Sequence, residues 1–235
     1  MANKVCEALN IKYPVIQGAM AWVATAPLAA AVSNAGGLGV LGVGFATPEI
    51  IREQIVKTRE LTEKPFAANV FMIPALLERN NPIFLEEKPP VLYVDILANL
   101  DPVLADKYFK IWHEAGIKIV FKASFISDAI MAEKAGADVI IVKGWEGGGH
   151  VTDESTMVLV PQAADVLTVP LVAGGGIADG RGMAAAIMLG ADGIEMGSAF
   201  CIAEETAVHE NFKKSILEAG DMSTVITGYC TGEPC

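Results

Sequence analysis

The sequence has little cysteine and little charge. Cys6, Cys201, Cys230 and Cys235 are the only cysteines among 235 residues, and no two of them form a C-x-x-C pair. So few cysteines exclude a disulfide-stapled scaffold and indicate free thiols in a reducing compartment. Charged residues make up 19% of the chain and hydrophobic residues 52%, a balance that excludes intrinsic disorder.

Basic residues and metal motifs are also scarce. The chain has 17 Lys and Arg against 28 Asp and Glu, a net charge of −11. Because an acidic surface repels phosphate backbones, we expect no nucleic-acid partner. No H-E-x-x-H motif, Cys/His cluster or G-x-S-x-G elbow is present, so we expect neither a metal site nor a serine nucleophile of that type.

No apolar run is both long and uninterrupted. The uncharged stretch Tyr13–Pro48 would be long enough to span a membrane, but Pro14, Pro27 and repeated glycines divide it. Glu7 and Lys12 precede the apolar part, which is not the order of a signal peptide. We therefore expect a soluble, cytoplasmic protein without a membrane partner.

The sequence does contain a regular series of short apolar runs rich in β-branched residues. They are nearly continuous rather than alternating, as in strands buried on both faces of a parallel sheet. The predicted strands are Val15–Gly18, Gly39–Gly44, Phe66–Asn69, Val91–Asp95, Lys118–Lys122, Val139–Lys143, Leu171–Gly174 and Gly193–Gly197. Their ends recur about every 26 residues, enough for a strand, a helix and two short loops.

Helical patterns fill the intervals, and several stop at a glycine that can form a left-handed cap. The predicted helices are Pro27–Ala35, Pro48–Leu61, Pro102–Ala115, Ser127–Ala135, Pro161–Leu167, Arg181–Leu189 and Glu204–Ala219. Eight strands at the spacing of strand–helix units predict an α/β protein with one domain over residues 1–235, a closed (β/α)8 TIM barrel. The rival is a doubly wound sheet, which places G-x-G-x-x-G after its first strand, whereas Gly36, Gly37 and Gly39 precede a strand.

In such a barrel the chemistry lies at the C-terminal ends of the strands. Gly174–Gly176 follow the seventh strand and Met196–Ser198 follow the eighth, where this fold usually binds phosphate. Bare glycine N–H groups and helix N-termini suit that role, and tight turns without a ligand are the alternative. The two loops together favour a phosphate site.

Polar residues at other strand ends are further candidates. His150 follows the glycines Gly147–Gly149 and is a candidate for proton transfer. Asn69 could bind the edge of a heterocycle or cap its own backbone, and both roles stay open. Lys122 or Lys143 could be a Schiff-base nucleophile if its pKa fell, although an ion paired with a nearby carboxylate such as Asp95 is the interpretation that composition favours.

Several segments resemble the family of flavin-dependent enoyl-acyl-carrier-protein reductases (type II) and nitronate monooxygenases (2-nitropropane dioxygenases). The resemblance runs in order through nearly the whole chain. It is carried by Tyr13–Trp22, Ala35–Gly39, Lys64–Phe66, Glu146–His150, Pro170–Gly182, Gly190–Phe200 and a stretch from His209 to about Gly228.

The resemblance implies FMN in the barrel mouth. By position, the backbone of Gly18, Ala19 and Met20 would lie against the flavin, and Asn69 would contact its ring system. The remaining expected cofactor-binding residues are Lys143, Gly149 and, at the phosphate end, Gly175, Gly176, Met196, Gly197 and Ser198. The resemblance also implies NADH or NADPH as reductant, an acyl-thioester or other small-molecule substrate, an acyl carrier protein as a candidate partner, and a homodimer.

His150 matches the active-site histidine of the family, which removes the carbon-bound proton of the nitroalkane in the monooxygenases and lies beside the flavin in the reductases. The segments Met20–Val23 and Pro170–Gly182 are more similar to the reductases, so an enoyl-thioester reductase is the first expectation and a nitronate monooxygenase the alternative. A Schiff-base lyase and a catalytically silent flavin binder are alternatives of another kind.

The chain departs from the family at four places. Lys143 stands where Glu or Gln is usual, Thr152 replaces a glycine, and Asp95–Asn99 replaces a small, glycine-rich strand end. The chain also stops at Cys235, before the usual C-terminal extension of the family. Lys143 replaces a polar contact of the family, where a cation would favour the anionic reduced flavin or its phosphate. The strand end Asp95–Asn99 and the short C-terminus concern the substrate, so the resemblance does not carry substrate specificity over.

Overall fold

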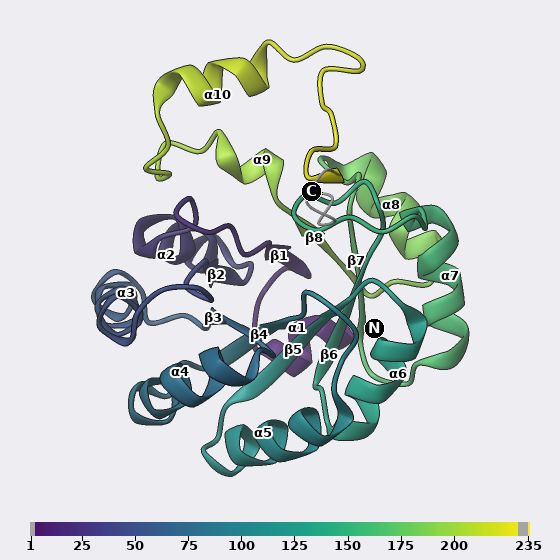
Figure 1. Cartoon of the computed structure of the whole chain (residues 1–235). Helices are drawn as coiled ribbons and strands as arrows, with labels where there is room; N and C mark the ends of the chain where they lie inside the picture. The colour runs from purple at the N-terminus through teal and green to yellow at the C-terminus, as the bar shows by residue number, and fades with distance from the viewer. Residues whose placement is uncertain (1–2, 230–234) are drawn as a thin grey trace.

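The computed structural model describes residues 3–229 and residue 235, and it forms the predicted (β/α)8 barrel (Figure 1). Cys230 lies outside the described residues. One parallel sheet holds eight strands in the order β1-β8-β7-β6-β5-β4-β3-β2. The strands are β1 (Val15–Gln17), β2 (Gly39–Leu41), β3 (Phe66–Phe71), β4 (Val91–Asp95), β5 (Lys118–Ala123), β6 (Val139–Lys143), β7 (Leu171–Gly174) and β8 (Gly193–Met196). Each begins where the predicted run begins and ends within three residues of the predicted end.

β1 and β2 close the barrel with little backbone pairing. A single bridge joins Ile16 to Leu38. The buried side-chain amide of Gln17 completes the seam, because its oxygen accepts a hydrogen bond from the Val40 N–H at 3.0 Å and its nitrogen donates to the Val40 carbonyl at 3.2 Å. A side chain thus replaces ladder bonds at the seam.

Helices surround the barrel (Figure 1). They are α2 (Ala26–Ala35), α3 (Pro48–Leu61), α4 (Pro74–Glu87), α5 (Pro102–Glu114), α6 (Ile126–Ala135), α7 (Thr156–Val166) and α8 (Gly180–Met188), with α1 (Lys4–Leu9) before the first strand and α9 (Ser198–Cys201) and α10 (Glu210–Leu217) after the last. Helices α2, α3, α5, α6 and α8 confirm the predicted bounds to within one residue. In the part of the chain that the structure describes, no helix combines the length and the apolarity needed to cross a bilayer.

The prediction misplaces the start of one helix and misses another, and in both cases a proline lies inside the observed helix. Helix α7 begins at Thr156, five residues before the predicted start at Pro161, which lies inside the helix instead. Helix α4 is absent from the prediction because Pro82 interrupts its pattern, yet the helix continues through that residue. Packing against neighbouring elements outweighs the loss of one backbone donor in each case.

The predicted helix Glu204–Ala219 is wrong at its start, since helix α10 begins only at Glu210 and ends at Leu217. The Thr206 hydroxyl donates to the carbonyls of Cys201 and Ala203 at 3.1 and 2.9 Å, which holds a turn after α9. The ring of His209 accepts a hydrogen bond from the Asn211 N–H at 3.1 Å and caps the start of α10. These side-chain bonds satisfy backbone groups that a continuous helix would use itself.

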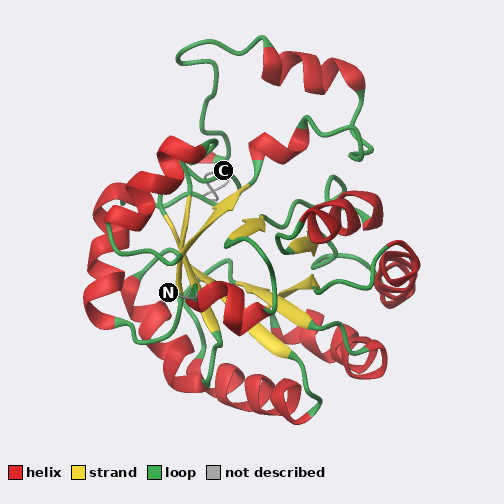
Figure 2. Cartoon of the chain, turned by 180° about the vertical axis from the view of Figure 1, so that it is seen from behind, coloured by secondary structure: helices red, strands yellow, loops and turns green. Residues whose placement is uncertain are grey.

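Two apolar shells hold the barrel together. The inner shell contains inward-facing strand residues such as Val120 and Ile141, together with Val5 and Leu9 of α1. Helix α1 therefore closes the N-terminal end of the barrel, where Figure 2 shows it lying across the strands. The outer shell lies between strands and helices and includes the fully buried Trp112.

Alternation along the strands sets the position of the site. On β4, Tyr93 and Asp95 are two residues apart and so share the inward face. The same alternation directs Lys122 of β5, Lys143 of β6 and Glu195 of β8 toward the barrel axis. The inner shell is thus apolar below and charged at its C-terminal end.

Candidate active site

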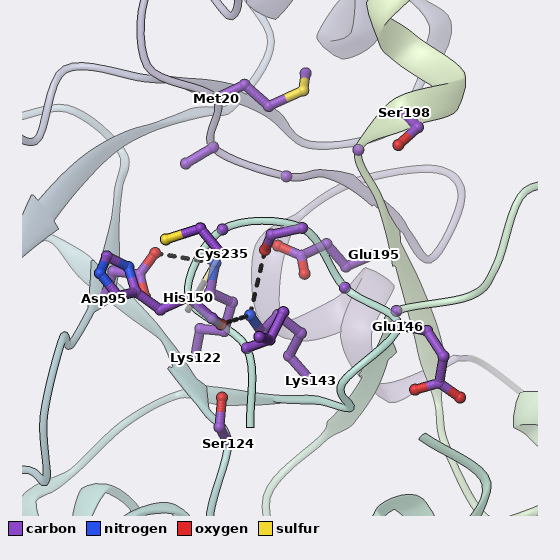
Figure 3. A pocket seen from close by; sticks show the side chains of 18 of the residues that line it. Met20, Asp95, Lys122, Ser124, Lys143, Glu146, His150, Glu195, Ser198 and Cys235 are labelled. Atoms are coloured by element: carbon purple, nitrogen blue, oxygen red, sulfur yellow. Dashed lines mark hydrogen bonds and ion pairs between the residues drawn. The ribbon is translucent and has the colours of Figure 1, made fainter. Parts of the chain in front are cut away.

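The C-terminal end of the barrel opens into a cavity of about 870 Å³, within the usual range for ligand pockets. The loops after the strands form its walls, and Figure 3 shows side chains of residues that line it. The cavity lining includes nearly all of the expected site residues, namely Gly18, Ala19, Met20, Lys143, Gly149, His150, Gly175, Gly176, Met196, Gly197 and Ser198.

Asn69 is the expected residue that does not line the cavity. Its side chain is buried in β3, and its amide nitrogen donates to the backbone carbonyl of Tyr93 at 3.2 Å. An added Cβ at Gly44 would lie only 2.4 Å from the Asn69 amide oxygen, so the chain after β2 covers this side chain. The amide joins β3 to β4, and its contact with a cofactor stays a prediction.

A layer of charged side chains forms the floor of the cavity. Lys122 Nζ and Asp95 Oδ2 are 2.9 Å apart (Figure 3). The Tyr93 hydroxyl donates to Oε1 of the buried Glu195, and Gly18 and Gly174 leave room for that carboxylate, since an added Cβ at Gly174 would lie 2.7 Å from it. With Lys143, the layer contains two cations and two carboxylates.

These contacts fix the protonation of the layer. Burial lowers the pKa of Lys122, but Asp95 and Glu195 outweigh that effect and leave the pKa above its ordinary value. Burial, followed by the charges of Glu195 and Asp95, raises the pKa of Tyr93 well above its ordinary value. Lys122 is therefore a protonated structural ion, which argues against a Schiff-base role at this residue, and Tyr93 remains a neutral donor.

Lys143 lies in a different electrostatic environment. Burial and the positive charge of Lys122 lower the pKa of Lys143 to about 8, against the opposing charges of Asp95 and Glu195. Its ammonium donates to the backbone carbonyls of Gly148, at 3.2 Å, and of His150. Lys143 thus contacts the loop that carries the candidate proton-transfer residue.

The loop between β6 and α7 is tied down by a residue that the sequence analysis does not single out. The Glu146 carboxylate accepts hydrogen bonds from the backbone N–H and the hydroxyl of Thr156, both at 2.9 Å. The same hydroxyl oxygen lies 3.2 and 3.1 Å from the carbonyl oxygens of Gly174 and Gly175, so its single hydrogen is shared among three acceptors. Thr156 therefore links the His150 loop to the glycine turn after β7.

That glycine turn has the geometry of an anion cradle. Gly175 and Gly176 have φ of 98° and 71°, a left-handed conformation that favours glycine. Within the described residues, the N–H groups of Gly176 and Ile177 donate to no other protein atom. Such adjacent, unused donors bind oxyanions, as expected for a phosphate.

One wall of the cavity is apolar. Phe45, Leu97 and Phe125 line it from the loops after β2, β4 and β5, and their exposed fractions are 48%, 40% and 48%. Phe45 stacks on Phe71 with ring centroids 4.2 Å apart. The opposite wall consists of the glycine turns and the His150 loop, so the cavity has an apolar and a polar side.

Two departures from the family pattern also lie at the cavity. Asp95 ends β4 and serves as the partner of Lys122. Thr152 lines the cavity, and its hydroxyl is buried without a hydrogen-bond partner among the described residues. No group of three or more His, Cys, Asp or Glu within the described ranges is arranged to hold a metal ion.

Comparison with known proteins identifies the family. The model of the nitronate monooxygenase family matches residues 3–88 and 96–235, which is nearly the whole chain. The chain belongs to the nitronate monooxygenase family. The unmatched segment 89–95 contains β4 and Asp95, yet β4 pairs in register with β3 and β5. The family membership makes the protein an FMN-dependent oxidoreductase.

Known proteins are similar to the chain over nearly its full length. A probable nitronate monooxygenase of Staphylococcus saprophyticus is 34% identical, with 100% of this chain and 78% of the relative covered. The structure of FabK from Thermotoga maritima has 39% identity and a TM-score of 0.93, covering 100% of this chain and 74% of that one. A nitroalkane oxidase from Streptomyces ansochromogenes has 27% identity and a TM-score of 0.85, covering 98% and 78%.

The residues present fit the flavin nucleotide of this family. The cavity is large enough for such a ligand, and the left-handed turn at Gly175 and Gly176 offers unused donors for its phosphate. Gly18, Ala19 and Gly197 line the cavity with little or no side chain, which leaves room for a flat ring system. The cavity and the glycine turn of this chain therefore suit the FMN cofactor of the family.

Proposed function

We propose that the protein is an NAD(P)H-dependent reductase of enoyl thioesters that uses FMN at the barrel mouth. The apolar wall of Phe45, Leu97 and Phe125 is the observation that carries the proposal, because an acyl chain needs an apolar surface and a small nitronate does not. The similarity to FabK, an enoyl-acyl-carrier-protein reductase II, supports the same substrate class.

The residues of this chain then divide into three tasks. The turn at Gly175 and Gly176, with Gly197 and Ser198 opposite, would hold the phosphate of FMN. The backbone of Gly18–Met20 would lie against its ring system. The charged side chains of the floor would close the barrel interior below the cofactor. Their fixed charges would also provide a constant electrostatic field beneath the site.

His150 is the proposed proton-transfer residue. It lies on the cavity lining at the end of a glycine segment, and it is the only histidine among the lining residues of the described chain. FMN supplies the redox chemistry when bound, and the protein supplies orientation, exclusion of water and a proton donor or acceptor. His150 would donate that proton to the α carbon of the enoyl C=C bond, the carbon beside the thioester carbonyl.

Nitronate monooxygenase is the second candidate. Curated relatives carry that name, and His150 would serve it equally by removing a carbon-bound proton. The two activities share the site and differ in the electron donor and acceptor. The reductase would pass electrons from NAD(P)H to an enoyl thioester, whereas the monooxygenase would oxidise the nitronate with dioxygen. A homodimer and a carrier-protein partner belong to the proposal as well.

The proposal is tested by two assays on the purified, FMN-loaded protein. NADH or NADPH oxidation that depends on crotonyl thioester supports the reductase. Oxygen consumption with a nitroalkane, and none of the first activity, overturns the reductase in favour of the monooxygenase. A stable borohydride-trapped adduct of Lys143 with a small carbonyl compound that is turned over would instead support a Schiff-base lyase.

A further inference from the structure

The loop that carries His150 contains a segment with little stiffness of its own. Gly147–Gly149 are three successive glycines, and the positions where a Cβ would stand at Gly148 and Gly149 are empty to 4 Å. Glycine loses more backbone entropy on ordering than any other residue. Contacts from outside the segment must therefore hold His150 at the cavity.

Glu146 cannot supply all of these contacts. Its carboxylate binds Thr156 and so fixes the loop before the glycines. The next residues, Gly147–Gly149, lie between that anchor and His150. A second anchor is needed on the far side of the glycines.

Lys143 supplies that second anchor from inside the barrel. Its side chain is 5% exposed, and its ammonium donates to the carbonyls of Gly148 and His150 (Figure 3). The loop also packs on its aliphatic part, since an added Cβ at Gly147 would lie 2.6 Å from Lys143 Cγ. The ammonium thus reaches both the middle and the end of the glycine segment.

We propose that Lys143 is a positioning residue, whose ammonium holds the glycine segment against the barrel and so places His150 for reaction. The effect on the reaction rests on the proposed role of His150, whereas the hold on the loop is independent of which substrate is used. Charge-assisted hydrogen bonds are about twice as strong as neutral ones, so the hold weakens when the amine loses its proton.

The surroundings of Lys143 set the pH at which its ammonium loses a proton. Burial and Lys122 lower the pKa of Lys143 to about 8. The titratable and charged groups that face it from the neighbouring elements are Asp95, Lys122, His150, Glu195 and Cys235. The carboxylates oppose the shift without cancelling it, so the loop should loosen as the pH rises through about 8.

Amide hydrogen exchange of the FMN-loaded protein tests the hold directly. The reporters are the N–H groups of Trp145 and Gly147, which donate to the carbonyls of Glu154 and Gly144 at 2.8 and 3.0 Å. At pH 7 we expect Lys143→Met to speed exchange of the loop about tenfold and to lower kcat about tenfold, while Lys143→Arg retains most of the protection. Lys118→Met is the matched control, because the Lys118 ammonium donates to the Ala8 carbonyl at the opposite end of the barrel.

A pH series on the wild-type protein gives a second test that needs no destabilising variant. After correction for intrinsic exchange, loop protection should fall between pH 7 and pH 9, and Lys143→Arg should abolish that fall. Unchanged loop exchange in Lys143→Met, or looser exchange with unchanged kcat, would overturn the proposal. Loss of protection in a protein that turns over neither substrate class would support the hold on the loop and overturn the proposed function alone.

Discussion

Lys122 and Asp95 form an ion pair of 2.9 Å in the floor of the cavity, with side-chain exposures of 14% and 15%. The pair joins the ends of β5 and β4 in the same layer as Glu195. Because the carboxylates raise the pKa of Lys122 despite its burial, this lysine is a structural cation. Ionic contacts therefore stabilise the floor of the site, and the candidate reactive residue, His150, lies in a loop above it.

Breaking this pair should destabilise the fold. Asp95→Asn leaves the Lys122 ammonium with Glu195 as its remaining carboxylate, and we expect the free energy of unfolding to fall by about 3 kcal/mol. Arg181→Ala is the control, since it removes an exposed pair with Asp179 and should cost less than about 1 kcal/mol. Urea unfolding at pH 7 measures both, and equal losses in the two variants would contradict a stabilising role of the buried pair.

Lys143 should have the opposite effect on global stability. Its pKa falls from 10.5 to about 8 on folding, so below pH 8 the folded protein carries a buried charge that costs about 3 kcal/mol. Between about pH 8 and 10.5 the unfolded chain binds more protons than the folded one, and wild-type stability rises with pH. Lys143→Met should therefore be more stable than wild type at pH 7, with an advantage that shrinks by pH 9.5 in urea unfolding. An advantage that stays constant or grows with pH would contradict the lowered pKa.

Removal of the His150 ring should impair turnover and leave the fold intact. We expect His150→Ala to lower kcat/KM by about 10²–10⁴-fold, the usual contribution of a positioned acid or base. His113→Ala is the control, because His113 lies in the last turn of α5 and pairs with Asp138 at 3.0 Å, away from the cavity lining. Steady-state kinetics with the accepted substrate compare the two, and equal activities would remove His150 from the mechanism.

The glycine turn after β7 should resist substitution for a backbone reason. At Gly176 an added Cβ meets Glu146 only at an ordinary 3.4 Å, but φ of 71° is costly for other residues, by roughly 1–2 kcal/mol. We expect Gly176→Ala to weaken FMN binding about tenfold in a fluorescence titration. Gly180→Ala, at the start of α8 where a Cβ meets open space, should leave affinity unchanged, and an equal loss there would argue against the cradle.

The sequence predicts the barrel well because strand burial and unit spacing are local properties of the chain. It fails at α4 and α7, where Pro82 and Pro161 resemble boundaries although tertiary packing carries the helices through them. The charged floor depends on closure of the barrel. Glu195 meets Tyr93, 102 residues earlier, only when β8 and β4 share one interior.

The candidate site could likewise be predicted only where it depends on residue type and position in the sequence, and not where it depends on contacts between distant elements. Loop glycines and His150 are visible in sequence because their types and positions after strands indicate function. The contact of Lys143 with the His150 loop depends on side-chain direction, and the role of Glu146 depends on the start of α7 at Thr156. Asp95, Lys122 and Lys143 at three strand ends already indicate paired ions, as Lys122 and Asp95 confirm, and the lone charged residue Glu195 in an apolar run is the further signal that could have completed the floor.

Anaerobic reoxidation of the bound flavin tests the proposed function most directly. The protein is reduced with NADH or NADPH in the absence of oxygen, and crotonyl thioester is then added while the visible flavin absorbance is followed. We predict rapid recovery of the oxidised spectrum within the turnover time. A flavin that stays reduced with the thioester, and reoxidises only with oxygen, would contradict an enoyl-thioester reductase.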